Sequence, residues 1–185
     1  MGYKLKHLKT ITKHKFLVTK YCFKSGLYLQ GLKHDLSKFG FVEFNGSAKF
    51  FQGTRSPINA EKEEFGYSLA WQHHKGHNAH HWEYWVDWKQ GKQYMVRIPE
   101  NYAYELVCDY IGAGKAYNNG TWAQSMPEDY YLKVRNMIFI HSETDVLLRT
   151  IFKDITDYGL DYACRKMKNK EYRYSENGKT TEFVV

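Results

Sequence analysis

Histidine and aspartate residues occur where the periodicity of the chain predicts the buried faces of helices. Residues 3–29 repeat apolar positions every three or four residues, as one long amphipathic helix does, and His14 lies in the middle of that stripe. Asp109 lies on the apolar stripe of a helix predicted from Pro99 to about Tyr117. Because an unpartnered polar side chain is costly in a core, both residues need partners there. The chain is therefore expected to fold so that separate helices converge on shared polar groups.

The remaining segments are also predicted to be mainly helical. A second short helix begins near His34, and residues 40–60 are a looser segment and a candidate for a mobile flap over a site. Further helices are predicted at about residues 59–76, 78–88, 127–141, 142–158 and 160–169. We therefore predict an all-α fold, a single compact bundle of about six to eight helices over residues 1–170, with residues 171–185 as a C-terminal tail whose last residues are β-prone.

The charge of the chain favours anionic partners. The formal net charge is +7 and the sequence pI is about 9.1, and an excess of positive charge attracts nucleotides, nucleic acids and phosphate esters. Much of this charge lies in the first 40 residues and between Arg165 and Arg173, and a solvated basic face is the alternative interpretation. No apolar run approaches the length that spans a membrane, so we expect no membrane partner.

The cysteines indicate a reducing compartment. Cys22, Cys108 and Cys164 are isolated in the sequence and odd in number. This pattern predicts free, buried thiols and a cytoplasmic location.

The segment Gly31–Phe39 carries the sharpest chemical signal in the chain. His34 and Asp35 are adjacent, and an imidazole beside a carboxylate suits a borderline or hard divalent metal such as Zn, Mn, Fe or Mg. Lys38 follows Asp35 by three residues, about one helical turn, and is placed to reach a phosphate held by that metal. For each residue a plainer role is the alternative, since Asp35 can cap a helix and Lys38 can be solvated.

A second cluster of candidate ligands lies between Trp71 and Trp85. Five of the nine histidines fall within residues 73–81. A polar aromatic surface, or adventitious binding of nickel or zinc, is the alternative for this stretch, as a satisfied core histidine is for His14. In chain order the candidate ligands are His14, His34, Asp35, His74, His80 or His81, and Asp109. Three separate helices that each carry His or Asp in this order favour metal binding.

This order of residues resembles the HD-type metal-dependent phosphohydrolase superfamily, whose pattern is His, His-Asp, His, His and Asp on helices. The segment Leu32–Lys38 is similar to the His-Asp segment of that superfamily, which often carries Lys three residues after the Asp. Residues 108–113 are similar to the helix that bears its last Asp. The resemblance covers roughly residues 10–115, and the spacing of the later histidines departs from the superfamily pattern. The chain also resembles a small family of bacterial and phage proteins of uncharacterised activity.

The resemblance implies an HD-domain-like metal-binding bundle and a hydrolase that cleaves a phosphoester through a metal-activated water. The charge and the aromatic content of the chain favour a nucleotide or related phosphoester as the substrate. The expected metal ligands are His14, His34, Asp35, His74, His81 and Asp109. The expected catalytic residues are Asp35, Lys38 and His80, the last as an acid for the leaving group. The expected substrate contacts are Lys38 and Lys75 for a phosphate and Trp82 for a stacked base. A place in the core is the preferred alternative for the tryptophans, because aromatic residues at helical spacing are typical of a core. The identity and number of the divalent metals, Zn, Mn, Fe or Mg, stay open, as does the oligomeric state.

Two other functions remain open at this point. One is a basic protein that binds nucleic acid or an acidic partner and uses its histidines structurally; its affinity would fall steeply with salt. The other keeps the metals but makes them iron, because some members of the resembled superfamily use a di-iron site for oxygen chemistry. His and carboxylate ligands do not decide among zinc, manganese and iron.

Overall fold

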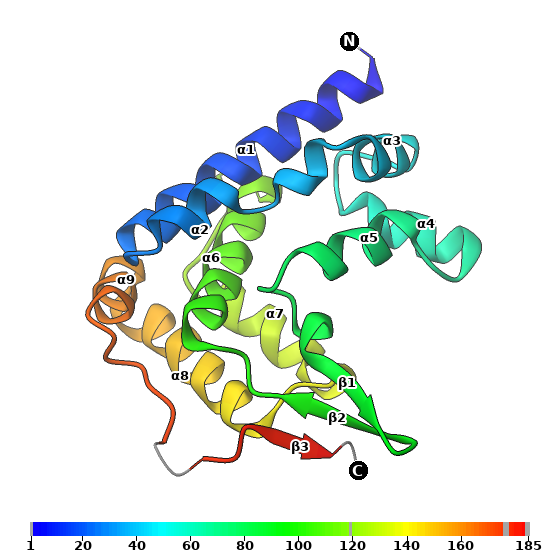
Figure 1. Ribbon diagram of the computed structural model, residues 1–185. Helices are drawn as coiled ribbons and strands as arrows, with labels where there is room; N and C mark the ends of the chain where they lie inside the picture. The colour runs from blue at the N-terminus through cyan, green and yellow to red at the C-terminus, as the bar shows by residue number, and fades with distance from the viewer. Residues whose placement is uncertain (1, 119, 176–177, 184–185) are drawn as a thin grey trace.

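The computed structural model describes residues 2–118, 120–175 and 178–183. The α-helices in these ranges are α1 (Tyr3–Lys24), α2 (Tyr28–Lys33), α3 (Phe41–Lys49), α4 (Pro57–Phe65), α5 (Leu69–His77), α6 (Glu100–Tyr117), α7 (Met126–Val134), α8 (Ser142–Tyr158) and α9 (Leu160–Lys168). The 3-10 helices are η1 (Leu36–Phe39), η2 (Trp82–Trp85) and η3 (Arg135–Met137), and the strands are β1 (Val86–Lys89), β2 (Lys92–Val96) and β3 (Thr181–Phe183). Figure 1 shows their arrangement. Helices account for 66% of the chain, which confirms the predicted mainly helical character.

The prediction of an all-α fold is confirmed only in part, because three strands form a small antiparallel sheet in the order β1-β2-β3 beside the helices. The helix predicted at residues 78–88 is replaced by η2 and β1. Gln90 and Gly91 join β1 to β2 with φ values of 52° and 74°, and positive φ at both central residues is typical of a two-residue hairpin turn. In the C-terminal segment, β3 pairs with β2, so that Phe183 lies opposite Tyr94.

Several predicted helix boundaries also differ from the observed ones. The helix predicted over residues 3–29 ends at Lys24, and Gly26 adopts a φ of 79° before α2 begins. The helix predicted over residues 59–76 is divided into α4 and α5 by Gly66, whose φ is 78°. Much of the looser segment predicted at residues 40–60 forms α3, and the helix predicted at 127–141 ends early, at Val134. The helices predicted after Pro99, at 142–158 and at 160–169 match α6, α8 and α9 closely.

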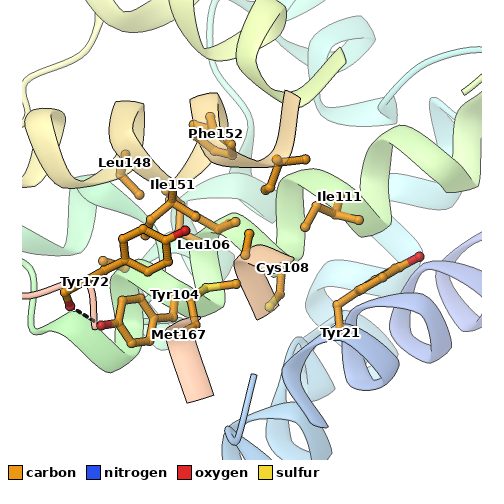
Figure 2. Packing of buried hydrophobic residues seen from close by; sticks show 14 of the residues in the cluster. Tyr21, Tyr104, Leu106, Cys108, Ile111, Leu148, Ile151, Phe152, Met167 and Tyr172 are labelled. Atoms are coloured by element: carbon orange, nitrogen blue, oxygen red, sulfur yellow. Dashed lines mark hydrogen bonds between the residues drawn. The ribbon is translucent and has the colours of Figure 1, made fainter. Parts of the chain in front are cut away.

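Helix α6 is the central element of the core. Its residues 103–108, 111 and 112 are all buried, so most of its circumference is covered by other helices. Figure 2 shows its side chains packed against those of α8, with Met167 of α9 and Tyr172 beside them. The prediction of free, buried cysteines is confirmed, because all three thiols are unpaired and buried. In the described part of the chain, no helix is both long and apolar enough to cross a membrane.

Helices α1 and α6 approach closely at a glycine. A Cβ atom added at Gly112 would lie 2.4 Å from Cγ2 of Val18 and 3.2 Å from its backbone nitrogen. Val18 lies one helical turn after His14, and Gly112 lies one turn after Asp109. The missing side chain at Gly112 therefore allows the two helices to bring His14 and Asp109 within reach of each other.

We predict that Gly112→Ala destabilises the protein by about 1 to 3 kcal/mol, because the added methyl group meets backbone atoms that cannot rotate away. Chemical denaturation of the variant and the parent measures this difference. Gly76→Ala is the matched control, since no atom lies within 4 Å of the added Cβ and alanine favours a helix by up to about 1 kcal/mol. Equal stability of the Gly112→Ala variant and the parent would show that the close approach is not needed.

Candidate metal centre

Four side chains from three parts of the chain meet between α1 and α6. His14 comes from α1, Asp109 from α6, and His34 and Asp35 from the turn between α2 and η1. Nε2 of His14 lies 3.3 Å from Oδ2 of Asp35 and 3.1 Å from Oδ1 of Asp109. Nε2 of His34 lies 3.2 Å and 3.5 Å from the same two oxygens. We call His14, His34, Asp35 and Asp109 the first ligand group.

A second group of histidines meets the other oxygen of Asp35. Nε2 of His74, from α5, lies 3.2 Å from Oδ1 of Asp35, and Nε2 of His80 lies 3.5 Å from it. Nε2 of His81 lies 2.9 Å from Nε2 of His74. His80 and His81 come from the turn between α5 and η2, not from a helix as predicted. We call Asp35, His74, His80 and His81 the second ligand group.

Asp35 belongs to both groups and has an unusual backbone conformation. Its φ of 53° lies in the left-handed region, which Asp tolerates better than most residues. The preceding helix is held in place from α1, because Lys15 donates hydrogen bonds to the carbonyls of Gly31 and Leu32 and Thr19 donates to Gly31. The turn that carries His34 and Asp35 is thus anchored to the same helix that supplies His14.

The distances within each group fit ligands of a common ion. One ligand atom from each residue lies within 4.8 Å of all the others in both groups. Ligand atoms 2.0–2.1 Å from one ion lie roughly 3.0 to 3.5 Å from each other, which matches the spacings of the first group. Among the described residues, Nε2 of His34, Oδ1 of Asp35, Nε2 of His80 and Oδ1 of Asp109 are buried without a hydrogen-bond partner. Such atoms require compensation, and a cation bound between them would supply it.

Two glutamates that the sequence analysis did not identify orient the imidazoles. Oε1 of Glu105 accepts hydrogen bonds from Nδ1 of His34 at 2.9 Å and pairs with Nδ1 of His80 at 3.2 Å. Oε2 of Glu43 accepts a hydrogen bond from Nδ1 of His74 at 2.7 Å. A carboxylate on Nδ1 directs Nε2 inward and raises its basicity as a ligand. Glu105 lies one turn before Asp109 on α6, so the sequence spacing places both on the same helix face. Glu43 lies in a segment predicted to be loose, where no such spacing applies.

The ionisable groups of the centre are strongly coupled. Burial alone would raise the pKa of Glu105, but its interactions with His34 and His80 lower that pKa to about 2. Burial likewise opposes charge on His34, yet the carboxylates of Asp35 and Asp109 raise the pKa of His34 well above its usual value. Burial and the neighbouring His80 hold the pKa of His81 well below its usual value, so His81 stays neutral. Without an ion, a proton on His34 therefore offsets part of the carboxylate charge.

The three proposed substrate contacts lie in different surroundings. Nζ of Lys38 lies 2.5 Å from Oδ2 of Asp35, and its side chain is 26% exposed, whereas those of His34 and Asp35 are at most 1% exposed. Trp82 packs against the hydrophobic core, with its ring 6.2 Å from that of Phe139. Lys75, on α5, lies near Glu83. Burial raises the pKa of the Glu83 carboxyl, and the charge of Lys75 offsets part of that rise. Of these three residues, the structure brings only Lys38 into direct contact with a ligand group.

We predict that Glu43→Gln weakens metal binding at the second ligand group by about 10- to 100-fold, because His74 loses the carboxylate that orients it. Isothermal titration of the metal-free protein with Zn²⁺ or Mn²⁺ measures both sites. Glu64→Gln, at an exposed glutamate of α4, is the matched control. Unchanged affinities in the Glu43→Gln variant would contradict the role of Glu43.

We also predict that the metal-free protein loses stability as the pH falls from about 4.5 to 2. The pKa of Glu105 is lowered from 4.5 to about 2 on folding, so its contribution is complete above pH 4.5 and lost as the folded carboxylate is protonated. The shift corresponds to about 3 kcal/mol. Urea unfolding across this range should show a smaller loss for Glu105→Gln than for the parent; equal losses would refute the assignment.

The comparisons with known proteins identify a family but no activity. No curated protein and no solved structure matches the chain. A model described as "Family of unknown function (DUF5662)" matches residues 3–154, a range that contains every residue of both ligand groups. The chain therefore belongs to this family of unknown function, DUF5662.

Proposed function

We propose that this chain is a metal-dependent phosphohydrolase with an HD-like arrangement of ligands and two neighbouring metal sites. The observation that carries the proposal is the buried carboxylate of Asp35. One of its oxygens faces His14 and His34, and the other faces His74 and His80. Paired metal sites that share a ligand are a recurrent arrangement in enzymes that cleave phosphate esters.

The charges of the centre support an anionic substrate. The carboxylates of Glu43 and Glu105 lie beside those of Asp35 and Asp109, and Lys38 forms an ion pair with Asp35. Two divalent ions would balance four carboxylates and leave the charge of Lys38 in excess. A phosphoryl group has the charge that such a site attracts.

When bound, the ions would supply Lewis acidity and a water of lowered pKa. The side chains of the two groups hold that chemistry in a buried site, where water is largely excluded and electrostatic interactions are strong. Solvent reaches the first group on the side of Lys38 and Asp109, whose side chains are 26% and 15% exposed. We therefore place the phosphoryl group of the substrate on this side.

Lys38 is the candidate phosphate contact. Burial would lower its pKa, but the carboxylates of Asp35 and Asp109 raise it, so the ammonium group stays protonated. A permanently charged ammonium donates hydrogen bonds to phosphate and stabilises the negative charge that develops during hydrolysis. Lys38 is therefore assigned to charge stabilisation and not to proton transfer.

His80 is better assigned to metal binding than to acid catalysis. Its Nδ1 faces Glu105 and its Nε2 faces Asp35, so both ring nitrogens are directed at groups of the centre. Burial and the neighbouring His34 also lower the pKa of His80, which leaves the ring neutral and suited to bind a cation.

The iron-based oxygenase is the second candidate, because imidazole and carboxylate ligands suit iron as well as zinc and manganese. We give the hydrolase first place because Lys38, in contact with Asp35, puts a cation beside the centre where a phosphate would bind. A nucleotide is the substrate class that we propose to test first, because of the basic and aromatic character of the chain.

We predict phosphate release from at least one member of a panel of nucleotides and simple phosphate esters, in the presence of Mn²⁺, Zn²⁺ or Fe²⁺. The double variant His34→Ala, Asp35→Ala should lose this activity entirely. Lys38→Ala should lower kcat/KM by about 10²- to 10³-fold, as the loss of one charge-stabilising donor does, while the metal content stays unchanged. Lys133→Ala, at an exposed lysine of α7, is the control. Equal activity in the double variant and the parent would dispose of the mechanism.

A further inference from the structure

One edge of the molecule exposes apolar side chains from four consecutive elements. Helices α1, α2, η1 and α3 lie along this edge (Figure 1), and α1 packs against both α2 and α3. Six apolar side chains of these elements, each more than half exposed, are used below: Phe16, Leu29, Leu32, Leu36, Phe41 and Val42. We call these six residues the apolar edge. Exposed apolar surface that extends over several elements marks an interaction site in a soluble protein.

Two of the elements that carry the apolar edge, α1 and α2, pack against each other. The rings of Phe23 on α1 and Tyr28 on α2 lie 5.4 Å apart in an edge-to-face contact, and both are themselves partly exposed. Lys15 on α1 donates a hydrogen bond to the carbonyl of Leu32, so the two helices are fixed to each other beside the exposed leucine. Phe41 is 84% exposed at the start of α3, although Phe44 and Phe51 nearby pack against His7.

The same part of the chain has a charge of one sign. Residues 1–34 contain no Asp or Glu. They contain eight lysines, which are Lys4, Lys6, Lys9, Lys13, Lys15, Lys20, Lys24 and Lys33. The first acidic residue of the chain is Asp35, which is buried in the metal centre. A partner of this edge must therefore be anionic and must also accept protruding leucine and phenylalanine side chains.

We propose that the apolar edge docks on the surface of an anionic lipid bilayer. Leucine and phenylalanine side chains would enter the boundary between headgroups and acyl chains, and Lys4, Lys6, Lys20 and Lys33 would lie at the lipid phosphates. Lys13 and Lys15 instead donate hydrogen bonds to backbone carbonyls, and Lys24 pairs with Asp161. A nucleic acid would satisfy the lysines but leave the aliphatic side chains in water. A second copy of this chain would bring two sets of eight lysines together, which like-charge repulsion opposes. The bilayer is the partner that accommodates both kinds of side chain.

This contact is peripheral and needs no helix of spanning length. The expectation from the sequence that no membrane is a partner rested on spanning length alone. The proposal is also independent of the metal centre, because none of the six residues of the apolar edge belongs to either ligand group.

Flotation of the full chain with lipid vesicles tests the proposal. The protein should float with vesicles of phosphatidylcholine that contain about one-third phosphatidylserine, and remain at the bottom with vesicles of phosphatidylcholine alone. The triple variant Phe16→Ser, Leu32→Ser, Phe41→Ser should bind at least tenfold more weakly. The variant Lys4→Gln, Lys6→Gln, Lys20→Gln, Lys33→Gln should also bind at least tenfold more weakly, and raised salt should weaken binding of the parent.

Matched controls distinguish binding through the apolar edge from nonspecific binding through apolar or charged residues elsewhere on the surface. Leu132→Ser, Met137→Ser, Tyr158→Ser removes three exposed apolar side chains elsewhere, and Lys89→Gln, Lys92→Gln, Lys133→Gln, Lys179→Gln removes the same charge elsewhere. Both controls should float as the parent does, and circular dichroism should show every variant folded. No flotation of the parent, or equal loss in edge and control variants, would overturn the proposal. Two other results would also overturn it: a dimer in solution that the edge variants abolish, or binding to DNA, but not to vesicles, that the edge variants abolish.

Discussion

The carboxylate of Asp35 is the group on which the arrangement of the surrounding elements depends. A charge that is 1% exposed is tolerated only when neighbouring groups compensate it. Helix α1 supplies His14, the turn between α2 and η1 supplies His34, and η1 supplies Lys38. Helix α5 and the turn after it supply His74 and His80. Elements that are far apart in the sequence are therefore held around one carboxylate, and its left-handed backbone places both of its oxygens at the meeting point.

Two further features support this centre. Gly112 allows α1 and α6 to approach until His14 and Asp109 are 3.1 Å apart. Glu105 and Glu43 bind the outer nitrogens of three imidazoles and leave the inner nitrogens directed at Asp35. Without ions, a proton on His34 replaces part of the missing positive charge, as the raised pKa of that imidazole indicates. Binding of an ion here would therefore release that proton, and acid conditions would oppose binding.

The residues that could be predicted from the sequence are those on helices with clear periodicity. His14 and Asp109 lie on buried stripes of α1 and α6, and their convergence with His34 and Asp35 is confirmed. The hairpin is missed because residues 78–88 are predicted as a helix, whereas residues 86–89 pair as a strand with residues 92–95. Glu105 was detectable, since it lies one turn from Asp109, but Glu43 was not, because its role depends on the tertiary position of α3. The turn between α5 and η2 likewise determines which of His74, His80 and His81 share a site, and helical periodicity does not predict the conformation of a turn.

The most direct test of the two-site account is the metal content of the protein, purified without a histidine tag and reconstituted with Zn²⁺, Mn²⁺ or Fe²⁺ before elemental analysis. The account predicts two ions per chain for the parent. It predicts fewer than one for Asp35→Asn, because the substitution removes the negative charge that both ligand groups share. A parent chain that retains no stoichiometric metal, or an Asp35→Asn variant that retains two ions, would contradict it.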